Sequence, residues 1–88
     1  MLDIVIVKVI LFTGPNCSLC DLAIDIVGQF NADVMNISAQ IELQKTNIRE
    51  SADLYHLYGA RIPVLKRTDA NDELGWPFTL ESLVEFLK

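Results

Sequence analysis

The sequence predicts an α/β fold in the order β-α-β-α-β-β-α, with a mixed four-stranded sheet flanked by helices. Three observations predict it. A nearly continuous β-branched run lies near the start of the chain, amphipathic stretches with helical periodicity separate shorter strand-like runs, and turn-forming residues lie between the last two of these runs. The 88 residues are 51% hydrophobic, which is enough for one modest core, so we expect a single domain over residues 1–88.

The first strand and the first helix have the clearest patterns. Residues 4–12 form an apolar, β-branched run interrupted by Lys8, which is typical of a strand buried on both faces. Turn-forming residues at 13–16 end this run. The residues that follow place one apolar stripe on a helix: Leu19, Ala23, Ile26, Val27 and Phe30. Asn16 or Ser18 can cap this helix.

The middle of the chain predicts a second strand, a short helix and a third strand. Residues 31–40 are ambiguous, and the alternation over 41–48 indicates a strand that a right-handed crossover makes parallel to the first. Residues 50–58 favour a short helix, with Gly59 suited to the position after its end. Ile-Pro-Val-Leu at 62–65 predicts the third strand.

The end of the chain predicts a hairpin and a last helix. Residues 68–72 are rich in turn formers, so the third strand and a fourth over 73–76 should pair as a hairpin. Thr79 is the predicted N-cap of the last helix. Phe78 before it can pack against Leu83, four positions inside the helix.

Charge and hydropathy exclude two classes of partner. The net charge is -5, from 12 acidic and 7 basic residues, and the basic residues are scattered, so we expect no nucleic-acid partner. The run at 4–12 is far shorter than the ~20 apolar residues of a membrane span. Asp3 stands where a signal peptide would carry positive charge. We therefore expect no membrane contact, a cytoplasmic location and a monomer.

The two cysteines, Cys17 and Cys20, lie where the first strand gives way to the first helix. In a reducing compartment this Cys-x-x-Cys spacing indicates redox or metal chemistry. Zinc takes about four ligands, and the single histidine, His56, lies far along the chain on a predicted surface helix, so no metal site is expected within one chain. We therefore predict a thiol–disulfide oxidoreductase that needs no cofactor.

The position of each cysteine assigns its role. Unpaired backbone N–H groups at a helix N-terminus lower the pKa of a thiol, so Cys17 is predicted to attack the substrate disulfide. A spacing of three residues puts Cys20 on the same helical face, close enough to form a disulfide with Cys17. Cys20 also continues an apolar row with Ile24 and Val27, so we expect it to be partly buried and to resolve the mixed disulfide.

The segment Arg61-Ile62-Pro63 is the second candidate feature. A proline at this position suits either a simple strand start or a cis peptide bond in a tight turn. Arg61 is either a positive neighbour that lowers the pKa of Cys17 or an exposed residue where the strand begins. We interpret Trp76 as a packing residue in preference to a substrate platform.

These motifs together resemble the glutaredoxin branch of the thioredoxin superfamily. The chain is most similar to small glutaredoxin-like proteins, which carry Cys-x-x-Cys, Arg-Ile-Pro-Val-Leu and Glu-Leu-x-Trp-Pro-Phe, the last found here at 73–78. The resemblance implies that the Ile62–Pro63 bond is cis and lies beside the cysteine pair. It also implies that the Ile62 backbone is free to pair with an extended substrate, which makes Arg61, Ile62 and Pro63 the predicted substrate-binding residues. The substrate would be a protein or low-molecular-weight disulfide, with glutathione as one candidate partner.

Three departures from the related families leave the reductant open between glutathione and thioredoxin reductase. Gly14 stands where typical glutaredoxins carry a lysine, Gly75-Trp76-Pro77 replaces their Gly-Gly segment, and Leu11 stands where thioredoxin has a buried acid. Three alternatives to a working enzyme also stay open: a thioredoxin-fold binding module, a redox sensor without turnover, and a metal or iron–sulfur site shared across a dimer.

Overall fold

A mixed four-stranded sheet with strand order β2-β1-β3-β4 forms the centre of the protein. It is seen in a computed structural model that describes residues 5–32 and 39–87. Strand β1 (Val5–Thr13) pairs in parallel with β2 (Ala39–Asn47). Strand β3 (Val64–Arg67) pairs antiparallel with both β1 and β4 (Glu73–Gly75). The predicted parallel crossover and the predicted hairpin are thus both confirmed.

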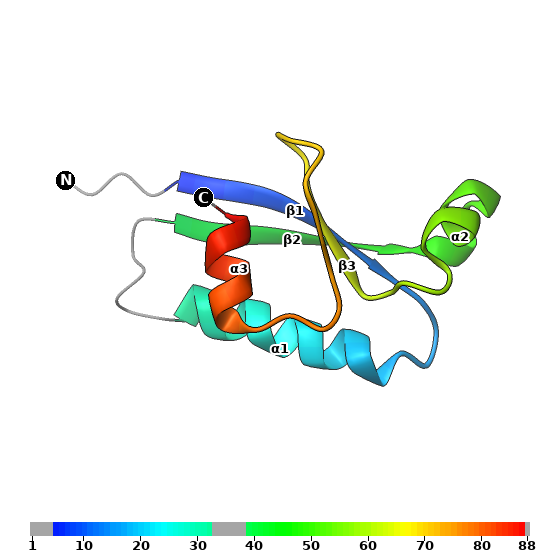
Figure 1. Cartoon of the computed structure of the whole chain (residues 1–88), viewed down its shortest axis with the longest axis horizontal. Coiled ribbons are helices and arrows are strands. Elements are labelled where there is room, and N and C mark those ends of the chain that lie inside the picture. Colours follow the sequence, from blue (N-terminus) through cyan, green and yellow to red (C-terminus); the bar gives the residue numbers. More distant parts are fainter. Residues whose placement is uncertain (1–4, 33–38, 88) are drawn as a thin grey trace.

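The helices flank this sheet unevenly. Helices α1 (Ser18–Ala32) and α3 (Leu80–Phe86) lie together on one face, whereas α2 (Ala52–Tyr58) lies at the end of the sheet where β1 ends (Figure 1). A short 3-10 turn, η1 (Ile48–Glu50), precedes α2. The predicted fold class, a mixed four-stranded sheet flanked by helices in the order β-α-β-α-β-β-α, is therefore confirmed.

Two apolar clusters hold the layers together. The larger lies between the sheet and the pair α1 and α3, and its fully buried members include Leu11, Leu65 and Leu83. The smaller joins the sheet to α2, and in it the ring of Phe12 stacks on that of Tyr58 with centroids 4.2 Å apart. Burying such side chains contributes roughly 1.5–3 kcal/mol each, so the clusters fix the arrangement of the layers.

Strand β1 is not buried on both faces along its whole length, as its composition had predicted. Val5 and Ile6 near its start are 59% and 62% exposed. On the face of Ile6 the reason is the size of α2, because this helix has seven residues and its cluster includes only Ile10 and Phe12 of β1. Val5 lies on the other face, at the very start of the strand and before the first buried residue, Val7. Full burial is reached in the second half of the strand, next to the cysteine pair.

Several boundaries differ from the predicted ones. Helix α1 continues to Ala32, while residues 33–38 of the ambiguous stretch lie outside the described residues. The helix predicted over 50–58 is divided, because Ser51 is extended and caps α2 through its hydroxyl. Gly59 does not adopt a left-handed conformation: its φ is -53°, and a Cβ there would lie 2.5 Å from a backbone oxygen of α2. Glycine is needed at this position for space.

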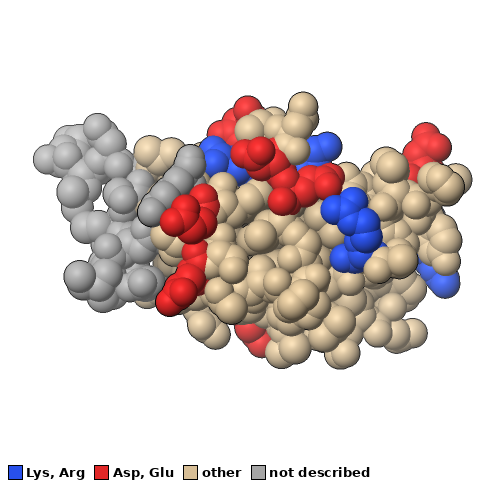
Figure 2. Space-filling view, in the orientation of Figure 1, with Lys and Arg blue, Asp and Glu red and all other residues tan. Residues whose placement is uncertain are grey.

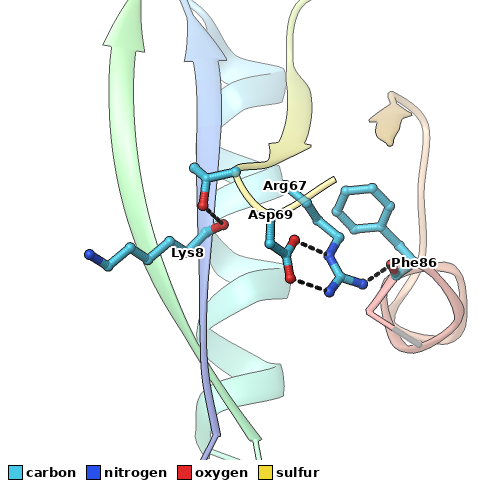
Figure 3. A network of polar contacts seen from close by, with 5 residues as sticks. Lys8, Arg67, Asp69 and Phe86 are labelled. Carbon is cyan, nitrogen blue, oxygen red and sulfur yellow. Dashed lines mark hydrogen bonds and ion pairs between the residues drawn. The ribbon is translucent and has the colours of Figure 1, made fainter. Parts of the chain in front are cut away.

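The last helix is fastened at both ends. Thr79 caps it, as predicted, by accepting a hydrogen bond from the Ser82 N–H. At its other end the Arg67 guanidinium donates to the Phe86 carbonyl and forms a two-point ion pair with Asp69 (Figure 3). Arg67 thereby ties β3 to the last turn of α3, where a cation suits the helix dipole.

Candidate redox site

Cys17 and Cys20 form a disulfide at the start of α1. Their Cα atoms are 5.2 Å apart, within the range that a disulfide needs. Cys17 directly precedes the helix and Cys20 lies in its first turn. The structure therefore describes the oxidised form of the pair, and the spacing was sufficient to predict that the two residues can bond.

Cys17 itself caps α1. Its Sγ accepts a hydrogen bond from the backbone N–H of Cys20 at 3.1 Å, which is the geometry of a side chain that caps a helix N-terminus. The prediction that Asn16 or Ser18 does this is wrong. Asn16 has a φ of 55° and turns the chain toward the helix, a conformation that asparagine tolerates, while Ser18 is already the first helical residue. The same N–H can stabilise a Cys17 thiolate once the disulfide is reduced.

The two cysteines differ in exposure. Cys17 is partly exposed, whereas Cys20 is 2% exposed and lies in the buried row of α1 with Ala23 and Val27. Leu19, which the helical pattern predicted to be in that row, is 44% exposed instead. A reagent can therefore reach the first sulfur more easily than the second, which agrees with the predicted roles of attacking and resolving thiol.

The surface around Cys17 is an open depression of about 490 Å³. It is lined by Thr13, Gly14, Asn16, Cys17, Ser18 and Asp21. Asp21 is the one charged residue of this lining. Other depressions on the described surface, one beside Lys8 and Glu42 and one along α3, contain no cysteine. The accessible sulfur and a space for a substrate thus coincide at one place.

The Ile62–Pro63 segment lies against the loop that leads to Cys17. A Cβ placed on Gly14 would be only 2.9 Å from Cδ1 of Ile62, so the Ile62 side chain occupies the space beside that glycine. The Ile62–Pro63 bond is cis, as the resemblance implied, and Pro63 is fully buried. A side chain larger than that of glycine at position 14 would therefore collide with Ile62.

The backbone of Ile62 is only half free. Its N–H donates to the carbonyl of Tyr58 at 3.1 Å, in the last turn of α2, so the prediction of a fully free backbone is wrong for this donor. The physical reason is that carbonyls at a helix C-terminus lack partners within the helix and accept from the chain that follows. Among the described residues nothing donates to the Ile62 carbonyl, which leaves an acceptor beside the site.

Arg61 has partners of its own. Its guanidinium pairs with one Glu73 oxygen at 3.1 Å and lies over the Tyr58 ring, 5.4 Å from the centroid. The Tyr58 hydroxyl donates to the other Glu73 oxygen. That hydrogen bond, followed by the Arg61 charge, holds the pKa of Glu73 below its usual range, while the same hydrogen bond to the carboxylate raises the pKa of Tyr58. The proposed effect of Arg61 on Cys17 stays a prediction.

The remaining candidates lie outside this site. Trp76 is partly buried and packs edge-to-face on Phe78 with centroids 5.1 Å apart, in agreement with a packing role. His56 is exposed on α2. Within the described residues no three His, Cys, Asp or Glu side chains are grouped so that they could hold a metal ion. No helix in the same part of the chain is long and apolar enough to cross a membrane.

A sheet of this order with a Cys-x-x-Cys pair at the start of its first helix defines a thioredoxin-like protein. The family model described as a glutaredoxin-like domain (DUF836) matches residues 8–88, so the chain belongs to this family. Its structure is also similar to the X-ray structure of a Northeast Structural Genomics target protein from X. campestris. The two share 30% sequence identity and a TM-score of 0.73, over 90% of this chain and 93% of the other. A search of curated proteins found no match.

Proposed function

We propose that this protein is a thiol–disulfide oxidoreductase that reduces disulfides through Cys17 and Cys20. One observation carries the proposal: the more exposed sulfur of a Cys-x-x-Cys pair accepts the N–H of a helix start, while its partner is buried beneath it. This arrangement stabilises a thiolate at the surface and keeps a second thiol within reach. The membership in the glutaredoxin-like family and the oxidised pair in the structure agree with it.

The exchange follows from these positions. The Cys17 thiolate attacks one sulfur of the substrate disulfide, forms a mixed disulfide and releases the other substrate sulfur as a thiolate. The Cys20 thiolate, formed as its proton passes to solvent, then attacks the Cys17 Sγ. This closes the Cys17–Cys20 disulfide and releases the second substrate thiolate. The substrate gains two electrons, which the protein loses, and an external thiol restores the dithiol by the reverse exchange.

The surroundings assign supporting roles. Ile62 forms the wall beside the Gly14 loop, and its carbonyl can accept one N–H from an extended substrate, while the buried Pro63 supports this segment from within. Arg61 contributes positive charge at the edge of this wall, moderated by its ion pair with Glu73. We propose that the protein works as a monomer in the cytoplasm, where a reducing environment keeps the pair ready to react.

The test is a comparison of wild type with Cys17→Ser and Cys20→Ser in the reduction of insulin and of a low-molecular-weight disulfide. We expect both variants to lose turnover. Cys20→Ser should in addition accumulate a mixed disulfide that mass spectrometry detects, whereas Cys17→Ser should not. A wild-type protein that forms the internal disulfide but never reduces a substrate would contradict the proposal and favour a sensor.

A further inference from the structure

The electrostatic surroundings of Cys17 are acidic. The depression around its sulfur contains one charged side chain, the exposed carboxylate of Asp21, and no lysine or arginine contributes to its lining. Asp25 is exposed one helical turn further along α1, and α1 contains no lysine or arginine. The chain as a whole carries a net charge of -5. A substrate that approaches this sulfur therefore meets negative charge first.

Arg61, next to Ile62, does not neutralise this negative charge. Arg61 pairs with Glu73 at 3.1 Å, so the charges of the two side chains largely cancel at a distance. Glu73 is held in its charged form, because its pKa is lowered by the hydrogen bond from Tyr58 and by the Arg61 guanidinium. The carboxylate of Asp21 is thus the charge that an incoming disulfide senses most directly.

Two exposed leucines add an apolar surface beside the charged depression. Leu19 and Leu22 lie three residues apart on α1 and are 44% and 50% exposed, so they share one side of the helix next to the cysteine pair. In the view of Figure 2 the lower part of the face, where α1 runs, is mostly uncharged, with acidic atoms at its lower edge. Apolar area at this position can be covered by the side chains of a protein substrate and not by a small polar disulfide.

We infer that the site selects protein disulfides with cationic and apolar neighbouring side chains, and that Asp21 is the residue that discriminates against anionic disulfides such as glutathione disulfide. The inference rests on the proposed thiol–disulfide exchange and names its substrate class. Glutathione carries a net negative charge at neutral pH, so Asp21 repels it. A basic segment is attracted by the same carboxylate, its apolar side chains cover Leu19 and Leu22, and one backbone N–H of the segment meets the Ile62 carbonyl.

The test uses two small disulfides of similar size and opposite charge, cystamine and 3,3′-dithiodipropionate. Reduced protein is mixed with each disulfide in a single turnover without added thiol, and closure of the internal disulfide is followed by acid quench and mass spectrometry. The ratio of the two rate constants is compared between wild type and Asp21→Asn. A changed pKa of Cys17 affects both rates equally, so the ratio isolates the charge effect.

We expect Asp21→Asn to lower the preference for cystamine about threefold to tenfold, as one carboxylate within a Debye length of the reacting sulfur should. The matched control is Glu81→Gln, which removes the same charge from the first turn of α3, over the other half of α1 (Figure 1). It should leave the ratio unchanged. Raising the salt concentration should reduce the wild-type preference more than that of Asp21→Asn.

The contact of Leu22 with apolar substrate side chains is tested separately. Leu22→Gln should lower the rate of exchange with the disulfide-linked dimer of the peptide Lys-Phe-Cys about threefold or more. It should leave the rate of exchange with cystamine unchanged. An unaltered ratio in Asp21→Asn, or equal losses for both substrates in Leu22→Gln, would overturn the assigned specificity while exchange itself persists. If the wild type reacts with neither small disulfide nor the peptide disulfide, the proposed function fails, and the specificity that rests on it fails too.

Discussion

Replacing Tyr58 by phenylalanine should destabilise the protein in a pH-dependent way. The variant keeps the ring, which stacks on Phe12, and removes only the hydroxyl that donates to Glu73. A hydrogen bond to a charged group contributes about 1.5–3 kcal/mol when buried. The Glu73 side chain is 26% exposed, so screening reduces the expected loss to about 1 kcal/mol at neutral pH.

The sign of the pH dependence follows from the pKa of Glu73. That pKa is lowered in the folded protein, first by the Tyr58 hydroxyl and then by Arg61, from an ordinary value of 4.5. The stabilisation is therefore fully present above pH 4.5 and is lost as the pH falls through the lowered value. The difference between wild type and Tyr58→Phe should be constant from pH 6 to 8 and should shrink below pH 4.5.

The assay is urea denaturation of the oxidised protein, followed by circular dichroism at each pH, with Glu73→Gln and the double variant completing a cycle. We expect a coupling energy of about 1 kcal/mol at pH 7 that vanishes at the acid end. A stability loss that is the same at pH 3.5 and pH 7, or two single losses that simply add, would refute the role given to this hydrogen bond.

Three further substitutions test the packing around the site. Gly14→Ala places a Cβ 2.9 Å from the Ile62 Cδ1 and should lower stability by about 1 kcal/mol in urea denaturation, and Ile62→Val, which removes that atom, should restore most of it. Gly59→Ala brings a Cβ within 2.5 Å of the Tyr55 carbonyl oxygen, so α2 must shift and thermal unfolding should register a loss of about 1–3 kcal/mol. Thr79→Ala removes the cap of α3 and should cost about 1 kcal/mol, with equal losses in the oxidised and reduced protein, because the cap is remote from the cysteines. Unchanged stability in any of the three would contradict the corresponding contact.

The parts of the fold with strong local signals were predictable. The β-branched run of β1 and the threonine cap of α3 are each encoded within a few residues. The parallel pairing of β1 and β2 follows from the length of the connection, because a helix between two strands of one sheet makes a crossover. The cysteine pair was predictable for the same reason, because a separation of three residues at a helix start brings the two sulfurs within bonding distance.

Contacts between distant residues explain what the sequence could not show. Glu73 reaches Tyr58 across 15 positions and Arg61 across 12, and no local pattern marks a glutamate for that task. The Ile62 N–H donates to the Tyr58 carbonyl in the last turn of α2, and the position of that carbonyl depends on where the helix ends. The helical pattern predicted buried positions for both Leu19 and Cys20, and only packing against the sheet decides that the cysteine faces inward while Leu19 is 44% exposed.

Cys17 links the stability of α1 to the chemistry of the site. Its Sγ accepts the Cys20 N–H that would otherwise lack a partner at the helix start, so the atom that reacts is also the cap. A serine hydroxyl accepts the same bond and is a preferred cap, whereas alanine leaves the N–H unpaired. Loss of activity in Cys17→Ser therefore reports the missing thiol alone, while Cys17→Ala would mix that loss with a frayed helix. The same reasoning predicts that thiolate formation leaves α1 in place: a charged sulfur accepts the Cys20 N–H more strongly, so the helix has a better cap when the nucleophile is formed.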